Sequence, residues 1–214
     1  MNAELTVLYA DDALLVLDKP SGLLSVPGRG ADKQDCLSRR AQHRYPDALV
    51  VHRLDMATSG LMVMARGAQA QRVLNAAFAA REVSKRYLAI VDGELTAPVT
   101  QWGIIDLPIA LDWPRRPLRI IDQQNGQASV TRWRVLEYKG AEGTSRLELE
   151  PVTGRSHQLR VHLQALGHAI VGDALYACPR IQAMAPRLLL HASSIELQHP
   201  LSRTAMRFVS PSSF

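Results

Sequence analysis

The chain has 214 residues, 47% of them hydrophobic, so it can bury one large core or two smaller ones. It contains no apolar run of about 20 residues, the length that a bilayer-spanning helix needs. The first residues, MNAELTVLY, lack the basic and apolar stretches of a secretory leader, and the formal charge of +5 favours a polyanionic partner, so we expect a cytoplasmic protein that binds nucleic acid.

The first half of the chain is predicted to contain four strands and two helices. Apolar alternation or short apolar runs between turn residues predict strands at 5–9, 13–19, 59–65 and 85–91. The third of these, SGLMVMA, is apolar on both faces, which is typical of a central strand covered on both sides. The helices are predicted over 33–44, where Asp32 is placed to act as N-cap, and near 68–82.

The second half begins with a stretch that we expect to be irregular. Residues 96–126 carry four prolines and the basic segment WPRRP, and we expect them to form a long functional loop or part of a smaller lobe. A helix is predicted near 157–166, with Ser156 as N-cap and Gly167 at its end. Further strands are predicted near 128–137, 145–150, 188–197 and 205–209.

The order of these elements predicts the fold class. Strands and helices do not alternate regularly, which argues against a doubly wound parallel sheet. We therefore expect an α+β fold with a mixed, largely antiparallel central β-sheet flanked by a few helices and loops. The sequence has no repeat and no obvious linker, so we expect residues 1–214 to form a single domain without an N-terminal S4-like RNA-binding domain.

Five segments carry a resemblance to a known family. The stretch VHRLDMATSG at 51–60 closely resembles the HRLDxxTSG signature of the RluA-type pseudouridine synthases. Four more segments match that family in the right order: KPSGL at 19–23, KRYLA at 85–89, TGRSHQLR at 153–160 and LHA at 190–192. The resemblance implies the pseudouridine synthase catalytic fold and an isomerase that converts uridine to pseudouridine in structured RNA.

The short length and the segment DWP at 112–114 are most similar to the dual-specificity members of the family. This resemblance implies action on both 23S ribosomal RNA and the anticodon stem-loop of certain tRNAs. An enzyme acting on ribosomal RNA only remains an alternative. So do a non-catalytic RNA-binding or RNA-folding module on the same scaffold and a base glycosylase.

The resemblance identifies Asp55 as the catalytic carboxylate. Isomerisation breaks an N-glycosidic bond, which calls for an ionised carboxylate beside the sugar or the base, as nucleophile or base. A dry pocket raises the pKa of such a group, and Arg155, which matches the family's aspartate-pairing arginine, is our candidate for the offsetting cation. Taken alone, Asp55 would be interpreted as a turn or salt-bridge residue and Arg155 as a surface charge.

Further matching residues are predicted to contact the substrate. The resemblance places Tyr87 with Asp55 and Arg155 among the catalytic residues, where its ring is predicted to stack on the target base while Lys85 and Arg86 hold phosphates. Core packing is the commoner role of a strand tyrosine. The target nucleotide has to be flipped out of folded RNA. Arg53 matches the family arginine that enters the RNA as the base leaves, with a phosphate contact as the alternative. Leu190 is predicted to be an apolar wall of the pocket, or plain core.

No metal and no organic cofactor are expected. His157 and His162 are five residues apart, so they do not share a helix face, and no HxxxH or HExxH pattern occurs. The two cysteines, Cys36 and Cys178, form no CxxC pair and are expected to be free thiols.

Clustered basic residues extend the predicted RNA contact. Three clusters occur outside the matched arginine at 155: Arg39, Arg40, His43 and Arg44; Lys85 and Arg86; and Arg115, Arg116 and Arg119. Such clusters bind phosphates by releasing counterions, although each one alone is also typical of a solvated face. We expect ribosomal RNA and tRNA stem-loops as partners, no membrane, no obligate protein partner and a monomeric protein.

Overall fold

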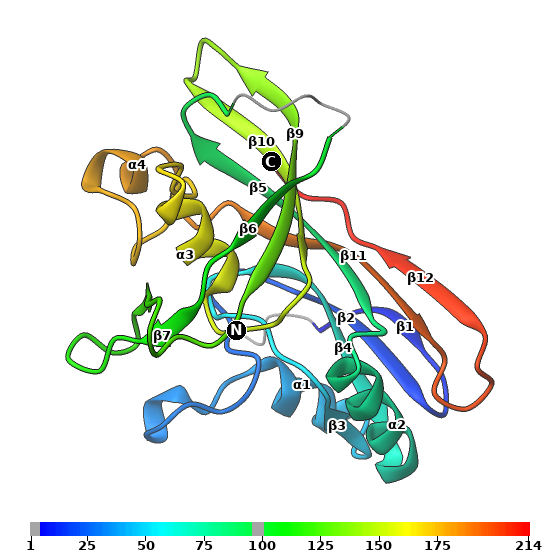
Figure 1. Ribbon diagram of the computed structural model, residues 1–214. Coiled ribbons are helices and arrows are strands. Elements are labelled where there is room, and N and C mark those ends of the chain that lie inside the picture. The colour runs from blue at the N-terminus through cyan, green and yellow to red at the C-terminus, as the bar shows by residue number, and fades with distance from the viewer. Residues whose placement is uncertain (1–4, 96–100) are drawn as a thin grey trace. The chain divides into compact units, whose positions relative to one another are not determined.

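The computed structural model describes residues 5–95 and 101–214 of the chain. By packing, the chain divides into two units, which we call the first unit (Met1–Lys85 and His191–Ser213) and the second unit (Arg86–Leu190 and Phe214). Each unit is built on a β-sheet with a few helices beside it (Figure 1). This arrangement confirms the predicted α+β fold with a mixed, largely antiparallel sheet. None of the helices in the described part is long and apolar enough to cross a membrane.

The sheet of the first unit is centred on β4 (Ser59–Arg66), in which every residue except the last is buried. One edge of β4 pairs with β2 (Leu14–Lys19), which pairs in turn with β1 (Thr6–Ala10). The other edge pairs in parallel with β11 (Leu190–Gln198) at its start and antiparallel with β3 (Ala48–Val50) at its end. β12 (Ala205–Val209) pairs with β11. The prediction of a central strand covered on both faces is confirmed.

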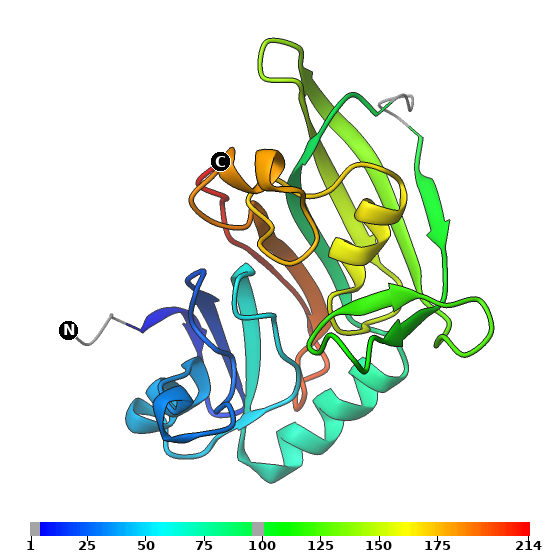
Figure 2. The same ribbon diagram turned by 90° about the vertical axis from the view of Figure 1, so that its left-hand side faces the viewer.

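Two helices accompany this sheet. α2 (Gly67–Ala79) packs on β4 and β3 through Ala70 and Leu74, and Figure 2 shows it as the long helix that follows the strand β4. α1 (Leu37–Arg44) starts four residues later than predicted, after a short 3-10 turn at Ala31–Lys33.

The prediction that Asp32 caps this helix is wrong. The N-cap is Cys36, and its side chain makes no capping hydrogen bond. The first N–H groups of α1 are satisfied instead by a distant loop, because Leu37 donates to the carbonyl of Leu24 and Ser38 donates to that of Ser25. The β-bridge between Leu24 and Cys36 holds the two segments side by side, so these backbone carbonyls replace a side-chain cap.

A close approach of two backbones fixes the start of β4. Gly60 has a φ of +105°, and a Cβ there would lie 2.3 Å from the carbonyl oxygen of Ala192 on β11. Only glycine tolerates both the left-handed φ and this approach. Next to it, Ser59 Oγ lies 3.0 Å from Nδ1 of the buried His191. Ser59 and Gly60 of the matched signature thus allow β4 to pair closely with β11.

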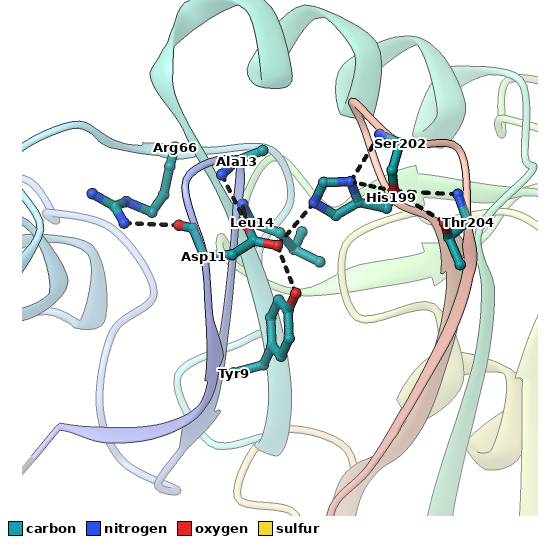
Figure 3. Close-up of polar contacts among 8 residues, drawn as sticks. All are labelled: Tyr9, Asp11, Ala13, Leu14, Arg66, His199, Ser202 and Thr204. Atoms are coloured by element: carbon teal, nitrogen blue, oxygen red, sulfur yellow. Dashed lines mark hydrogen bonds and ion pairs between the residues drawn. The ribbon is translucent and has the colours of Figure 1, made fainter.

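A cluster of polar contacts ties two hairpin turns of the first unit together (Figure 3). The carboxylate of Asp11, in the β1–β2 turn, accepts hydrogen bonds from Tyr9 Oη at 2.6 Å and His199 Nε2 at 3.0 Å. Burial raises the pKa of Asp11, but these bonds and those from the N–H groups of Ala13 and Leu14 outweigh it and lower the pKa overall. His199 Nδ1 accepts the backbone N–H of Ser202. The set resembles a Ser–His–Asp triad in composition, but its geometry joins the two turns.

The sheet of the second unit is antiparallel throughout. Its strands, in spatial order, are β5 (Ser84–Asp92), β10 (Thr144–Pro151), β9 (Val130–Lys139) and β6 (Gly103–Asp106). α3 (Gln158–Ala165) packs on β9 and β10 and on the separate hairpin of β7 (Ile109–Leu111) and β8 (Arg119–Ile121). Figure 2 shows α3 and this hairpin side by side, and α4 (Pro179–Ala183) follows α3 in the chain.

The prediction that 96–126 is irregular is wrong for the described part of that stretch. It contains β6, β7 and β8, and residues 96–100 lie outside the described residues. Pro108, Pro114 and Pro117 fall between the strands, where a missing N–H does no harm to a ladder. Strands of three or four residues show too little alternation to be recognised from sequence, and the same holds for β3.

The ring of His52 is held neutral inside the first unit. Nε2 accepts the backbone N–H of Val63 at 2.9 Å, and the ring stacks on Phe78 of α2 with centroids 4.6 Å apart. Burial, together with the nearby ammonium of Lys85, lowers the pKa of His52 to about 3. An imidazole that has to stay neutral in the folded state makes stability depend on pH.

We predict that this histidine destabilises the protein in acid. Between the unfolded-state pKa of about 6.5 and the folded-state value, the unfolded chain binds the extra proton, so the folding equilibrium constant falls up to about tenfold per pH unit as the pH drops. In His52→Gln an amide oxygen accepts from Val63 without titrating, so urea midpoints measured from pH 7 to pH 4 should fall less steeply. His43→Gln, which removes an exposed histidine, is the control. Equal slopes for the wild type and His52→Gln would contradict the prediction.

Candidate active site

Asp55 lies in the loop between β3 and β4, and a second loop holds it on both sides. Ser25 Oγ donates to the carbonyl of Leu54 at 2.7 Å and accepts its N–H at 3.1 Å. Ser21 Oγ donates to the carbonyl of Ala57 at 2.7 Å. The carbonyl of Asp55 itself accepts from Thr58 and closes a tight turn. The partly buried Asp55 side chain therefore stands on a backbone with few remaining degrees of freedom.

The ammonium of Lys19 completes this support. Lys19 ends β2 and is fully buried, and its Nζ donates to the carbonyls of Pro20 at 2.9 Å, Leu23 at 2.8 Å and Met56 at 3.0 Å. Burial lowers the pKa of Lys19 to about 8, while the negative charge of Asp55 acts in the opposite direction. Lys19 thus fixes the backbone next to Asp55 and places a positive charge near its carboxylate.

The sequence contains a signal for this role that the family resemblance alone does not reveal. KPSGL matches a family segment, but the match gives its lysine no function. A lysine at the end of an apolar strand, directly before a proline, is a candidate for burial, and a buried ammonium requires acceptors.

Arg155 lies in the loop between β10 and α3, and Gln158 anchors that loop to β9. Gln158 Oε1 accepts from the N–H of Arg155 at 3.0 Å and from Thr153 Oγ1 at 2.7 Å. Its Nε2 donates to the carbonyl of Val130 and to Thr131 Oγ1, each at 3.0 Å. Thr153 and Gln158 of the TGRSHQLR motif therefore hold the backbone at Arg155 in place.

Tyr176 holds the other end of the same loop. His157 has a φ of +58°, and its Nδ1 lies 2.7 Å from Tyr176 Oη. The ring of Tyr176 packs on Arg160, which forms a buried bidentate ion pair with Asp173 at 2.6 and 2.8 Å. The prediction of Ser156 as N-cap is wrong, because His157 occupies that position in a left-handed conformation without a side-chain cap.

The side chain of Arg155 is exposed, and its Nε reaches the carbonyl of Ala128 only at 3.5 Å. A cavity of about 610 Å³ lies beside it, between this loop and the β7–β8 hairpin. The guanidinium is therefore available to a ligand on that side.

The other predicted residues occupy different environments. Tyr87 lies on β5 opposite Leu149 of β10 and is partly buried, and Leu190 is buried at the start of β11. Arg53 is exposed in the Asp55 loop. Asp55, Arg53 and Lys85 belong to the first unit, and Tyr87, Arg86, Arg155 and Leu190 to the second. Their joint roles stay predictions.

The two cations beside Tyr87 differ from ordinary phosphate ligands. Burial lowers the pKa of Lys85. Arg86 lies on the strand face opposite to Tyr87, since side chains alternate along β5. Its Nη1 is 2.5 Å from Glu150 Oε2, and its guanidinium lies over the ring of Trp102.

Within residues 5–95 and 101–214, no group of three or more His, Cys, Asp or Glu side chains is placed to hold a metal ion. Cys36 and Cys178 are free thiols, as predicted.

Comparison with known proteins decides the family. A family model described as RNA pseudouridylate synthase matches residues 13–165. The chain belongs to this family. It is therefore an isomerase of the pseudouridine synthase class, and the prediction made from the five motifs is confirmed.

Similar proteins cover almost the whole chain. The dual-specificity RNA pseudouridine synthase RluA of Escherichia coli strain K12 is 49% identical over 210 residues, which are 98% of this chain and 94% of that protein. The protein of the same name from Haemophilus ducreyi is 45% identical over 208 residues, or 97% of this chain and 93% of that protein. The solved structure of human RNA Pseudouridylate Synthase Domain Containing 1 matches with a TM-score of 0.81 and 29% identity, covering 99% of this chain and 84% of its own.

We predict that Lys19→Met lowers kcat for pseudouridine formation at least tenfold and leaves KM for RNA nearly unchanged. Three carbonyls lose their charged donor, which costs about 3 kcal/mol of unfolding free energy, and the charge near Asp55 disappears. Steady-state kinetics on a stem-loop RNA and urea denaturation measure the two effects. Lys33→Met removes an exposed lysine from the same unit and should match the wild type. A Lys19→Met variant with normal kcat would refute the positioning role.

Proposed function

We propose that this chain isomerises specific uridines in both 23S ribosomal RNA and the anticodon stem-loop of certain tRNAs. The observation that carries the proposal is the 45–49% identity, over nearly the full length, to proteins named dual-specificity RNA pseudouridine synthase. We further propose that the two units act as one catalytic domain and that the protein works as a monomer in the cytoplasm, without a cofactor.

In this proposal Asp55 is the catalytic carboxylate. Its loop is rigidly supported by Ser21, Ser25 and Lys19, and a fixed carboxylate is what nucleophilic or base catalysis at a glycosidic carbon requires. Lys19 places a positive charge near the Asp55 carboxylate, and we assign the ion pair with Asp55 to Arg155 once RNA is bound.

The remaining predicted residues divide into substrate contacts and supporting residues. Tyr87 stacks on the flipped base and Leu190 forms an apolar wall beside it, while Arg53 fills the space that the base leaves in the RNA. Lys85 and Arg86 were predicted to hold phosphates. The lowered pKa of Lys85 and the contact of Arg86 with Glu150 favour a supporting role for both behind the RNA surface.

A non-catalytic RNA-binding module, the alternative that the sequence left open, does not account for the site. The basic clusters suit it equally well, but a pure RNA binder has no use for a carboxylate facing a polyanion. The elaborate support of the Asp55 loop therefore favours the enzyme.

We predict that Asp55→Asn abolishes turnover and leaves RNA affinity within about threefold of the wild type. The amide keeps the size of the carboxylate but is neither a nucleophile nor a base. Purified protein without added cofactor would be mixed with a uridine-labelled anticodon stem-loop, and pseudouridine would be quantified after nuclease digestion. Asp47→Asn, which changes an exposed carboxylate on the same unit, is the control. Turnover in Asp55→Asn at the wild-type rate would refute the assignment, and release of free uracil by the wild type would indicate a glycosylase.

The substrate range can be tested by mapping pseudouridines in cellular RNA. In a strain that lacks this protein, pseudouridine should disappear from at least one site in 23S ribosomal RNA and from the anticodon stem-loop of a set of tRNAs. Restoring the gene should recover both, whereas the Asp55→Asn version should recover neither. Loss from ribosomal RNA alone would reduce the proposal to a single-substrate enzyme.

A further inference from the structure

The cavity next to Arg155 is built like a nucleotide pocket. Its volume of about 610 Å³ lies within the range of about 300–1,000 Å³ that is usual for ligand pockets. The side chains around it that bear on a ligand are Trp113, Arg119, Asp122, Asn125, Gln127 and Arg155. All of them belong to the second unit, and neither Tyr87 nor Leu190 lines the cavity. It is therefore a different space from the one proposed for the target base on those two residues.

Arg119 lines this cavity, and one donor of its side chain is unpaired. Its Nε is buried. Among the buried side-chain nitrogen and oxygen atoms of the described residues, it is the one atom without a hydrogen-bond partner. A buried guanidinium N–H without an acceptor is costly, and its natural ligand is an anion. The backbone of Arg119 is fixed, because its N–H donates to Tyr176 Oη at 2.9 Å. Arg155 adds a second, exposed guanidinium to the same cavity.

The lining also contains one carboxylate, which forms no ion pair with Arg119 or Arg155 among the contacts of the described residues. Asp122 accepts the backbone N–H groups of Gln124 and Asn125 at 2.9 and 3.0 Å, and its other oxygen lies 3.4 Å from Asn125 Nδ2. These bonds lower the pKa of Asp122 and hold its carboxylate against the backbone of its own turn. The lining thus carries two guanidiniums and one carboxylate, a formal net charge of +1 that still favours an incoming phosphate.

Trp113 supplies an aromatic surface at the edge of the cavity. The ring is 65% exposed, an unusual state for the largest apolar side chain, and Arg116 lies over it at 4.5 Å from the centroid. Exposed aromatic rings beside arginines are typical of surfaces that stack unpaired bases. Asn125 and Gln127, with amides that both donate and accept, suit the edge of a base.

We propose that this cavity binds one unpaired nucleotide next to the target uridine. Its phosphate contacts Arg119, its base stacks on Trp113, and Asn125 and Gln127 read the base edge. The inference rests on the proposed function for the nature of the substrate. It makes Asn125 and Gln127 specificity-determining residues and Arg119 the residue that positions the nucleotide, since the enzyme would select target sites by the base beside them.

A double-mutant cycle between protein and RNA tests the contact. The full chain would be titrated with anticodon stem-loop RNAs in which each phosphate flanking the target is replaced in turn by a neutral methylphosphonate. We expect Arg119→Gln to weaken binding of the unmodified RNA about tenfold and to lower the slope of log K against log salt by about one. At one methylphosphonate position the Arg119→Gln effect should vanish. Trp113→Ala should likewise cause no further loss when the nucleotide at that position is abasic.

The control is Arg207→Gln, which removes the same charge from the exposed strand β12. Its effect should be small and equal for all the RNAs. Thermal melts establish that Arg119→Gln is folded, and methylphosphonate scanning with wild-type protein gives a readout that needs no variant. If the Arg119→Gln effect adds to every methylphosphonate equally, or if no flanking phosphate matters to the wild type, the inference is overturned. Turnover by the wild type is measured in parallel, because its absence would refute the proposed function while the binding cycle still decides the cavity.

Discussion

A buried ammonium holds together the loop that carries Asp55. Lys19 directs its three donors to the carbonyls of Pro20, Leu23 and Met56, so one side chain joins the end of β2 to a loop 37 residues later. A buried cation without such partners would cost several kcal/mol, so the loop cannot leave this arrangement without exposing or stranding the charge. Its pKa of about 8 keeps it protonated at neutral pH, and the nearby Asp55 contributes to that. The same ammonium thus supports the backbone of the loop and places a positive charge near the Asp55 carboxylate.

The Arg155 loop is supported by neutral groups instead. The amide of Gln158 uses both its oxygen and its nitrogen on the loop and on β9, and Tyr176 holds His157 in a left-handed conformation. Burial also lowers the pKa of His162, which lies behind the same network and stays neutral. A cation thus supports the loop of the acidic residue, and uncharged hydrogen bonds support the loop of the basic one. In each case the support does not repel the charge of the side chain that the loop carries.

Periodicity and motifs predicted most of the fold because both depend on neighbours in the chain. The buried run of β4 and the stripe of α2 were recognised for this reason. The errors share the opposite cause. α1 begins at Leu37 because the carbonyls of a distant loop replace a cap, and α3 begins without Ser156 because Tyr176, 20 residues later, holds its first turn. For the site, the motifs indicate Asp55 and Arg155 as candidates, but the role of Lys19 depends on acceptors that only the folded chain brings to it.

Net charge says little about which arginines bind RNA. Arg40 lies on Asp35, Arg115 on Asp112 and Arg86 on Glu150. Exposed pairs such as the first contribute little stability, so a phosphate can displace Asp35 at small cost. Arg86 is different, because Trp102 covers its guanidinium and Glu150 is mostly buried, so it is better suited to stiffen the sheet. An arginine already held by a carboxylate inside the protein is thus a poorer candidate for a phosphate contact than one that is free of such a partner. Among the arginines of the predicted basic clusters, Arg119 has its backbone bound to Tyr176, and its buried Nε has no acceptor in the described chain.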